Sequence, residues 1–412
     1  MNEKNKSYLS PQNILILVSL TGILLFFIVA PIVRIRIFDW IAMENNSIWA
    51  ALDYFRHLYY SINRETCYGT AGDTVFSPLA YVIYHLIYLA SSDTGTSVGH
   101  VRQMLSMPYQ NIIFMIYSVI GMLLVIFDVE LLNLSIKKKF AVIFCIFFSV
   151  PFLMGGLERG NLTVYCAAIL VMAVLLSRSE NKIYREIALL LIAFAAGLKI
   201  YVAAAGLVYL AEKRWKEAGR LITYGSVFFF LPFALLGGRD GFLRYLHTIT
   251  AYTATTYTDR IEFIQGLLNY FHIVGNAASI LSFLFLLILI ALLLITKDDF
   301  RRMVFLAGML AFVPGNAYRY ALLYFLLPLF IFFLTNKDKK IESYIDGVLL
   351  GSIFTIPTLL GVATDFKLAY GVYAMTSVEV FIYIPAWALL FFNMIVELYY
   401  CASYYKNKNK TV

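Results

Sequence analysis

Charged residues are scarce in this sequence. Of its 412 residues only 14% are charged, whereas 61% are hydrophobic. A soluble domain of this length needs far more charge to cover its surface, so the composition excludes an ordinary soluble protein and indicates a polytopic membrane protein. We find no low-complexity linker, soluble domain or internal repeat that would divide the chain. We therefore expect one all-α membrane domain over residues 1–412.

Cysteines and metal-binding motifs are also few. The sequence has four cysteines, and only Cys67 lies in a segment that we expect to be aqueous, so a disulfide framework is not expected. There is no Asp-x-Asp, His-Glu-x-x-His or Cys-x-x-Cys motif and no Walker-type glycine loop. A nucleotide-sugar and metal clamp and a structural zinc site therefore have no support in the sequence. We predict no metal site and no cofactor.

The net charge is +8, and the basic residues form short clusters between long apolar runs. The clusters are Lys137–Lys139, Arg178–Arg185, Lys213–Arg220, Lys297–Arg302, Lys337–Lys340 and Lys406–Lys410. This placement is typical of the cytoplasmic loops of a membrane protein rather than of a nucleic-acid-binding surface. We therefore predict a multi-pass protein of the plasma membrane with both termini in the cytoplasm, and no nucleic-acid partner.

The N-terminal part of the chain is expected to combine two spans with a long external loop. Asn13–Val33 holds about 20 apolar residues, enough to cross a hydrocarbon core of about 30 Å. Residues 34–110 would form the external loop, and Asn111–Leu134 the second span. Pro78–Ala90 is short for a crossing, and a crossing there would move the next basic cluster outside. We interpret this run as an interfacial helix.

The apolar block Ile187–Ala211 has basic residues on both sides. A single crossing would put one flank outside, so we predict a re-entrant hairpin of two half-depth helices with its tip near Gly197 and Lys199. Later spans are expected at Leu221–Leu236, Leu267–Ile295, Met303–Val313, Ala321–Leu334, Val348–Val362 and Val378–Tyr400. Together with the earlier apolar runs, this gives about 11 to 13 membrane segments.

Polar side chains of unusual placement gather in the turns that this topology puts outside. One such turn, Met154–Asn161, joins two apolar runs. Ionisable groups at membrane level are costly to bury and are often functional, whereas helix capping and snorkelling are the alternative for any one of them. We expect one external, substrate-binding cavity lined by His57, Glu158, Arg159, Asn161, Lys199, Tyr201, His247, Arg319 and Tyr320.

Asp53 is the candidate catalytic base. If residues 51–60 are helical, Asp53, His57 and Tyr60 share a face. A carboxylate there could accept a proton from an acceptor hydroxyl. A helix N-cap or a surface acid on an amphipathic helix is an equally good interpretation of this residue by itself.

Several short motifs resemble glycosyltransferase family 87, within the polyprenyl-phosphate-dependent glycosyltransferases of the GT-C fold. They are Asp53 in the first loop, Pro78-Leu79, the turn Glu158-Arg-Gly-Asn161, and Gly197-Leu-Lys199 before a helix that ends in Lys213-Arg-Trp215. The likeness runs from about Asp53 to Arg220, with a looser echo at Pro314–Tyr320. The chain departs from the family pattern where Ser77 replaces a proline, where Glu158 and Arg159 replace Gly-Gln, and where Ile200 replaces a proline after the lysine.

The resemblance implies a GT-C-like bundle and a membrane glycosyltransferase. Such an enzyme moves a sugar, mannose or another hexose, from a polyprenyl-phosphate donor to a glycan or glycolipid acceptor on the external face. Asp53 would be the base of an inverting transfer, and Lys199 and Arg319 would stabilise the departing phosphate.

Two alternatives remain open. An O-antigen or capsule repeat-unit polymerase uses the same fold class and lipid-linked substrates. A lipid or sugar transporter belongs to a different class, although the paired repeats and mid-membrane ionisable residues expected of one are not evident.

Overall fold

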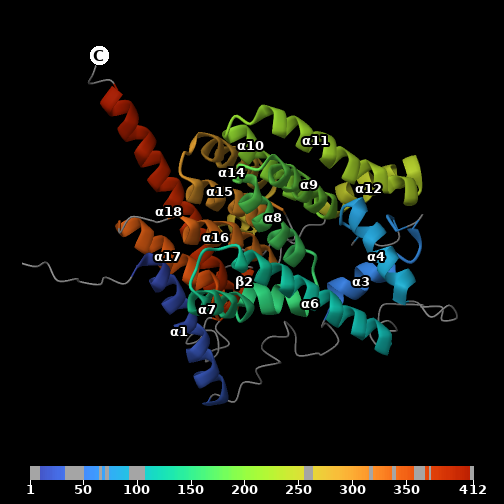
Figure 1. The fold of residues 1–412 in the computed structure, drawn as a ribbon, viewed down its shortest axis with the longest axis horizontal. Helices are drawn as coiled ribbons and strands as arrows, with labels where there is room; N and C mark the ends of the chain where they lie inside the picture. The colour runs from blue at the N-terminus through green and yellow to red at the C-terminus, as the bar shows by residue number, and fades with distance from the viewer. Residues whose placement is uncertain are drawn as a thin grey trace, which may run out of the picture.

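Long apolar helices dominate the protein in a computed structural model (Figure 1). The structure describes residues 10–32, 51–64, 67–69, 74–91, 107–254, 263–314, 319–335, 340–356, 367–370 and 373–408. Within these ranges, five segments are long and apolar enough to cross a membrane. They lie in α1 (Pro11–Ile32), α6 (Pro108–Glu130), α11 (Trp215–Phe230) with η5 (Leu231–Leu235), α14 (Gly275–Ile295) and α18 (Ser377–Lys408).

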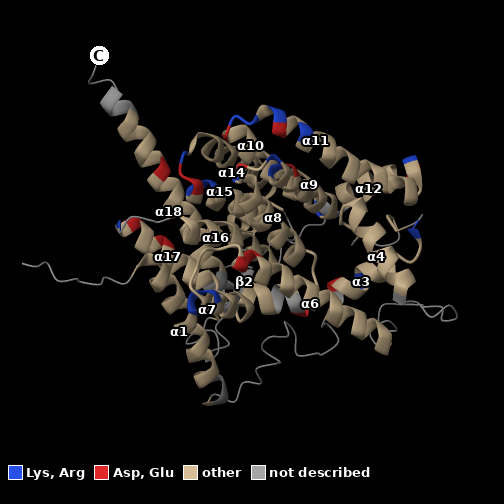
Figure 2. Cartoon of the chain, in the orientation of Figure 1, with Lys and Arg blue, Asp and Glu red and all other residues tan. Residues whose placement is uncertain are grey.

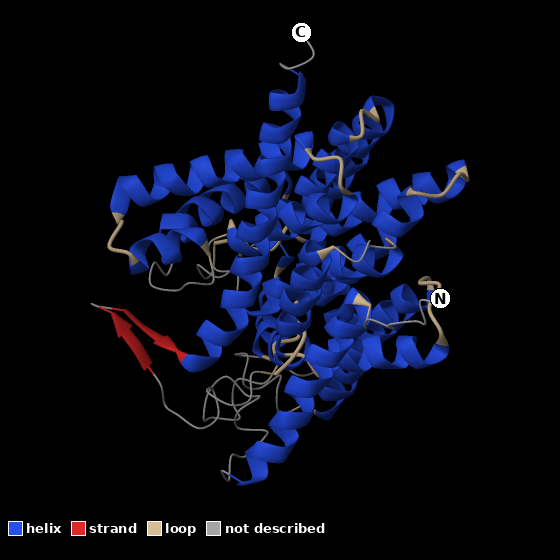
Figure 3. Cartoon of the chain, turned by 90° about the vertical axis from the view of Figure 1, so that its left-hand side faces the viewer, coloured by secondary structure: helices blue, strands red, loops and turns tan. Residues whose placement is uncertain are grey.

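The prediction of an all-α, polytopic membrane protein is confirmed. The only β-structure in the described ranges is a small antiparallel hairpin, β1 (Lys367–Tyr370) and β2 (Tyr373–Thr376), which precedes α18 (Figure 3). Helix boundaries differ in places from those expected. The predicted span Leu267–Ile295 is divided into α13 (Ile264–Tyr270) and α14. The predicted span Val348–Val362 overlaps α17, which starts earlier and covers Ile341–Ile353. Residues 357–362 of this predicted span lie outside the described residues.

Shorter helices form the centre of the bundle. Nearly every residue is buried in α15 (Asp299–Phe312), η6 (Arg319–Phe325) and α16 (Leu326–Leu334), and two thirds of the residues are buried in α8 (Thr163–Ser177). Because other parts of the chain cover these segments, they form the core to which the longer, more exposed spans attach. At the periphery, α17 lies against α1, where a Cβ on Gly351 would come within 2.6 Å of the Leu15 carbonyl oxygen. Small residues permit such close helix packing in a membrane.

The segment Ile187–Ala211 belongs to a hairpin, as predicted. Helix α9 (Lys182–Leu198) ends at Lys199, and the chain returns through η4 (Ile200–Gly206) and α10 (Leu207–Ala211). α9 runs beside α11 in the same direction, because Glu186 pairs with Arg220 at 2.6 Å while Gly197 lies against Phe228. The returning arm therefore brings the chain back to the end from which α9 started. The first arm is longer than an expected half-depth helix, since the 17 residues of α9 extend about 26 Å.

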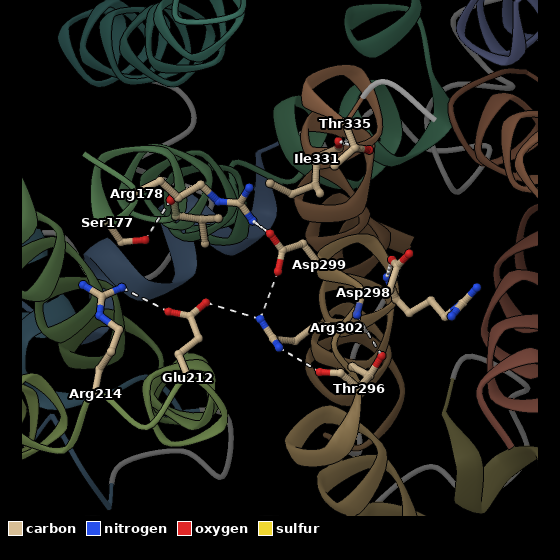
Figure 4. A network of polar contacts seen from close by, with 12 residues as sticks. Ser177, Arg178, Glu212, Arg214, Thr296, Asp298, Asp299, Arg302, Ile331 and Thr335 are labelled. Carbon is tan, nitrogen blue, oxygen red and sulfur yellow. Dashed lines mark hydrogen bonds and ion pairs between the residues drawn. The ribbon is translucent and has the colours of Figure 1, made fainter. Parts of the chain in front are cut away.

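Basic clusters from three different loops meet at that same end of the bundle (Figures 2 and 4). Asp299 pairs with Arg178 and with Arg302, each at 3.0 Å, and Arg302 also lies 3.3 Å from Glu212. Arg214 pairs with the other oxygen of Glu212 at 3.1 Å. Nearby in sequence, Arg301 pairs with Glu342 of α17 and Glu397 of α18, at 3.2 and 3.1 Å. These loops share one side of the bundle, as the charge pattern predicts; the identity of that side as the cytoplasm stays a prediction.

Three helices cover the opposite end: α3 (Leu52–Tyr60), α4 (Pro78–Ser91) and α12 (Gly238–Ala254) (Figure 1). The Tyr68 ring joins α4 and α12, because its centre lies 5.2 Å from the Tyr81 ring of α4 and 5.1 Å from the Tyr245 ring of α12. With 14 residues, α4 is about 21 Å long, shorter than a hydrocarbon core. Much of the predicted loop 34–110 lies outside the described residues, so its external position and the interfacial role of α4 remain predictions.

Candidate functional site

Three segments meet at the end of the bundle that carries α3 and α4. They are the first turn of α3, the turn Glu158–Asn161 and the tip of the hairpin at Lys199. Backbone hydrogen bonds hold the first two together. The Ala51 amide donates to the Glu158 carbonyl, and the Tyr54 amide donates to the Arg159 carbonyl at 3.1 Å. The first amides of a helix have no partner within it, so the turn supplies acceptors for the start of α3. This pairing sets Asp53, in that first helical turn, beside the 158–161 segment.

Gly160 makes the sharp turn possible. A π-helix (Pro151–Glu158) leads into it, and α8 begins at Thr163 directly after it. Gly160 has φ +63°, in the left-handed region, and a Cβ there would lie 2.7 Å from both Tyr54 Cβ and a Phe114 ring carbon. Glycine alone tolerates this combination of conformation and close contact. The turn therefore packs tightly under α3 and directs the Asn161 side chain inwards.

Asn161 joins a carboxylate to an ammonium group. Its Nδ2 donates to Asp53 Oδ2 at 2.8 Å, and its Oδ1 accepts from Lys199 Nζ at 2.7 Å. The same Oδ1 accepts from the backbone amide of Thr163 at 3.0 Å and from its hydroxyl at 2.8 Å. Asn161 is 1% exposed, and bonds of this kind to charged groups are among the stronger ones in proteins. Its amide thus fixes Asp53 and Lys199 relative to each other.

The Lys199 side chain is buried at the hairpin tip, with 5% of its surface exposed. Besides Asn161, its Nζ contacts Thr163 Oγ1 at 2.7 Å. Its Nζ also lies over the rings of Phe76, Tyr320 and Tyr201, at 4.9, 5.1 and 5.8 Å from their centres. Buried charges require such partners. The extended backbone at Lys199 ends α9, and the Ser77 amide donates to the Leu198 carbonyl at 3.3 Å, which ties the tip to the start of α4.

Arg159 brings a second cation to Asp53. One Arg159 Nη lies 3.6 Å from Asp53 Oδ1, so the carboxylate has the amide on one oxygen and the guanidinium on the other. Both side chains are largely enclosed, at 16% and 13% exposure. The structure thus brings Asp53, Arg159, Asn161 and Lys199 together, and their role in binding or catalysis stays a prediction.

His57 is buried one turn after Asp53. Its Nδ1 lies 3.0 Å from the Tyr81 hydroxyl, and its ring stacks on Phe76 with 3.8 Å between centres. Burial lowers the pKa of His57 well below its usual value, and the charges of Arg56 and Lys199 lower it further. The imidazole is therefore neutral at physiological pH. It suits a hydrogen-bonding and packing role under the cluster.

The other predicted site residues differ in their distance from this cluster. Tyr201 and Tyr320 face Lys199, and the Tyr324 hydroxyl donates to the Tyr201 hydroxyl at 3.3 Å. Arg319 is buried immediately before Tyr320 at the start of η6. Glu158 contributes its carbonyl to α3, as described above. His247 is exposed on α12, and the structure shows no contact that joins it to the cluster among the described residues.

Thr163 and Phe76 complete the cluster and were not predicted. Thr163 could have been suspected, because a threonine two residues after an asparagine often donates to its side chain in a local turn. Phe76 carries no comparable signal among 34 phenylalanines. Among the described residues, no group of three or more His, Cys, Asp or Glu side chains gathers where a metal ion could bind.

Comparison with known proteins adds one match. Residues 98–315 match the model of glycosyltransferase family 87, a span of more than half of the 412 residues. The matched span includes Arg159, Asn161 and Lys199, whereas Asp53 and Arg319 lie outside it. No curated protein and no solved structure matches the chain.

Proposed function

The chain belongs to glycosyltransferase family 87, and from that premise we propose that it transfers a hexose from a polyprenyl-phosphate donor to a glycan or glycolipid acceptor. The observation that supports this most directly is the hydrogen-bonded series Asp53, Asn161 and Lys199, with bonds of 2.8 and 2.7 Å. Glycosyl transfer from a lipid phosphate needs a base for the acceptor and a cation for the leaving group. The series offers one of each, held by a single amide.

In the proposed reaction the acceptor oxygen attacks the anomeric carbon of the donor. The bond from that carbon to the phosphate oxygen breaks, and polyprenyl phosphate departs with the bonding pair. Asp53 takes the proton of the acceptor hydroxyl, and attack from the face opposite the phosphate inverts the anomeric configuration. Asn161 orients the Asp53 carboxylate during this step.

Lys199 is the proposed partner of the phosphate. An ammonium group has three N–H donors, and Asn161 and Thr163 accept two of them. The third can meet a phosphate oxygen and stabilise the charge that develops on it, an effect that grows in a water-poor site. Arg159 and Arg319 add positive charge near the cluster, and the rings of Tyr201 and Tyr320, which lie beside the Lys199 ammonium, could stack on a sugar.

The base assignment is tested with Asp53→Asn. Asparagine keeps an acceptor for Asn161 but cannot take the proton, so transfer should fall by a factor of about 100 or more while the protein still accumulates in the membrane. The matched control is Asp240→Asn, the same change at an exposed acid in the first turn of α12. Transfer is followed with a radiolabelled hexosyl polyprenyl phosphate, and the anomeric configuration of the product by NMR. Full activity of Asp53→Asn would overturn the assignment.

The same assay separates this reaction from polymerisation. A repeat-unit polymerase requires an oligosaccharide on a polyprenyl diphosphate, so activity with that donor and none with the monophosphate would replace the proposal.

We also propose that the cluster faces the outside of the plasma membrane. The test uses variants in which the four native cysteines are replaced and one new cysteine is introduced. One variant carries it at Asp240, an exposed position in α12 at the end of the bundle that carries the cluster. The other carries it at Glu180, an exposed position at the opposite end, beside the basic residue Arg178. A membrane-impermeant thiol reagent should label the first from outside intact cells and leave the second unlabelled. The reverse result would invert the orientation.

A further inference from the structure

An apolar groove lies on the other face of the hairpin's returning arm. Its volume is about 560 Å³, within the range of sites that hold small organic ligands. Residues of α9, η4, α10, α11, α14 and α15 line it, and every lining side chain is Ala, Gly, Ile, Leu, Phe or Met. Such a lining can hold a hydrocarbon chain but offers no partner to a polar group.

The groove has exposed apolar walls of the kind that would face the hydrocarbon of a membrane. Its walls include α11 and α14, two of the helices that are long and apolar enough to cross a bilayer. Ile200 and Ile222, on opposite walls, are 44% and 70% exposed. Small residues leave recesses in these walls, because Ala203 and Ala204 have short side chains and Gly225 has none. A long apolar molecule could therefore enter sideways from the bilayer.

The outer end of the groove is adjacent in the chain to the cation of the proposed site. Ile200 lines the groove, and Lys199 directly precedes it. The backbone at Lys199 is extended, so consecutive side chains point to opposite faces. Lys199 accordingly points inward to Asn161 while Ile200 borders the groove, with about 3.8 Å between their Cα atoms. A molecule with an anionic head and an apolar chain would meet both features by bending over the hairpin tip.

We propose that this groove binds the isoprenoid chain of the lipid-phosphate donor, with the units nearest the phosphate beside Ile200. The assignment rests on the proposed function for the chemical class of the ligand. A bilayer provides little hydrophobic gain for moving a chain from lipid into protein, so the groove selects by shape and packing. The short side chains at Ala203, Ala204 and Gly225 leave room for the branched methyl groups of an isoprenoid, which a straight acyl chain lacks.

The test is photolabelling of the purified full-length protein in nanodiscs. The probe is a C55 polyprenyl monophosphate with a diazirine in an isoprene unit near the phosphate, and labelled peptides are identified by mass spectrometry. Labels should map to η4, α11 or α14, and unlabelled C55 polyprenyl phosphate should displace the probe, whereas excess phosphatidylglycerol should not.

Two groove variants and a matched control sharpen the result. Gly225→Leu adds bulk to the groove at a position where no atom lies within 4 Å of the added Cβ, and Ala203→Phe adds bulk from η4. Each should reduce displaceable labelling about tenfold, equivalent to 1.4 kcal/mol of binding. Gly219→Leu is the control, since it is on the same helix, has equally open space around the new Cβ, and does not line the groove.

The possible failures point to different conclusions. If the wild-type protein shows no labelling that polyprenyl phosphate displaces, the lipid-phosphate donor itself is wrong and the groove assignment falls with it. If displaceable labelling occurs but maps away from the groove, or is unchanged in both groove variants, the groove assignment is overturned while the proposed reaction stands. Displacement by phosphatidylglycerol would identify the groove as a site for bulk lipid.

Discussion

Asn161→Leu is the most informative single substitution in the cluster. The side chain keeps its shape but loses both polar atoms, so the bonds to Asp53 and Lys199 disappear together. Each is a hydrogen bond to a charged group, and such bonds contribute about 1.5–3 kcal/mol. Asn161 is 1% exposed, so water cannot replace them. If the loss of orientation is felt mainly in the transition state, kcat should fall about 100-fold to 1,000-fold, as when one stabilising donor is removed.

The assay is hexosyl transfer measured over a range of donor concentrations, with thermal unfolding in the same detergent. Because the amide orients groups that act in the transition state, kcat and kcat/KM should fall together. Thr163→Val is the graded comparison: it removes the Oγ1 contact to Lys199 but leaves the Asn161 contact, and should cause a smaller loss. A kcat for Asn161→Leu within about threefold of wild type, which is less than about 0.7 kcal/mol, would refute the reasoning.

Three further predictions concern the support around the cluster. Because the pKa of His57 is lowered by burial, the unfolded chain binds a proton that the folded protein does not, and stability should decrease as pH falls below about 6.5, by at most about 1.4 kcal/mol per pH unit. Unfolding temperatures measured from pH 7.5 to 5.5 should show this decrease, and the decrease should be smaller in His57→Phe. The exposed residue His247 provides the control, His247→Phe. An unchanged pH dependence in His57→Phe would contradict the assignment to His57. Gly160→Ala should destabilise the folded protein by more than the roughly 1–2 kcal/mol that a left-handed alanine costs, because its Cβ would also lie 2.7 Å from Tyr54 and Phe114. Gly238→Ala is the control and should show only the backbone cost, because Gly238 has a similar φ of +58° and open space around the added Cβ. Equal losses of unfolding temperature in the two glycine variants would show that the contacts do not matter. Asp128 of α6 is fully buried, and within the described residues neither carboxyl oxygen has a hydrogen-bond partner, so Asp128→Leu should raise the unfolding free energy by about 1–3 kcal/mol. Glu130→Leu, which breaks only the 2.7 Å pair with Lys139 near the surface, should change it by less than about 1 kcal/mol, and a loss of stability in Asp128→Leu would reveal an unseen partner.

The hairpin shows what charge pattern and hydropathy can predict. Basic residues on both sides of one apolar block required the chain to return, and the structure breaks the helix at Lys199 and brings it back. The length of the first arm was underestimated, because α9 starts at Lys182 within the basic flank and not at the first apolar residue. Hydropathy marks where the apolar surface begins, whereas the helix itself continues until its backbone amides meet a cap, here the Asn181 side chain.

The cluster shows where sequence reasoning ends. Polar residues in apolar surroundings were visible one by one, and their placement on one side followed from topology. Which of them touch could not be derived, because the bond from Asn161 to Asp53 joins residues 108 positions apart, and that to Lys199 spans 38 positions. Such contacts depend on how α3 sits on the turn at Gly160. Phe76 stayed hidden because an aromatic ring under a buried cation looks in sequence like any other core residue.

The return of the hairpin to its starting end has a consequence for how the protein is built during synthesis. A segment that enters the membrane and returns to the same side adds no net crossing. The orientations of the helices before and after residues 182–211 in the chain are therefore independent of whether this segment has yet inserted. Helices α8 and α11 can therefore be oriented by the translocation machinery first. The segment carrying Lys199 can fold into place afterwards, once the turn at Asn161 exists to receive its charge.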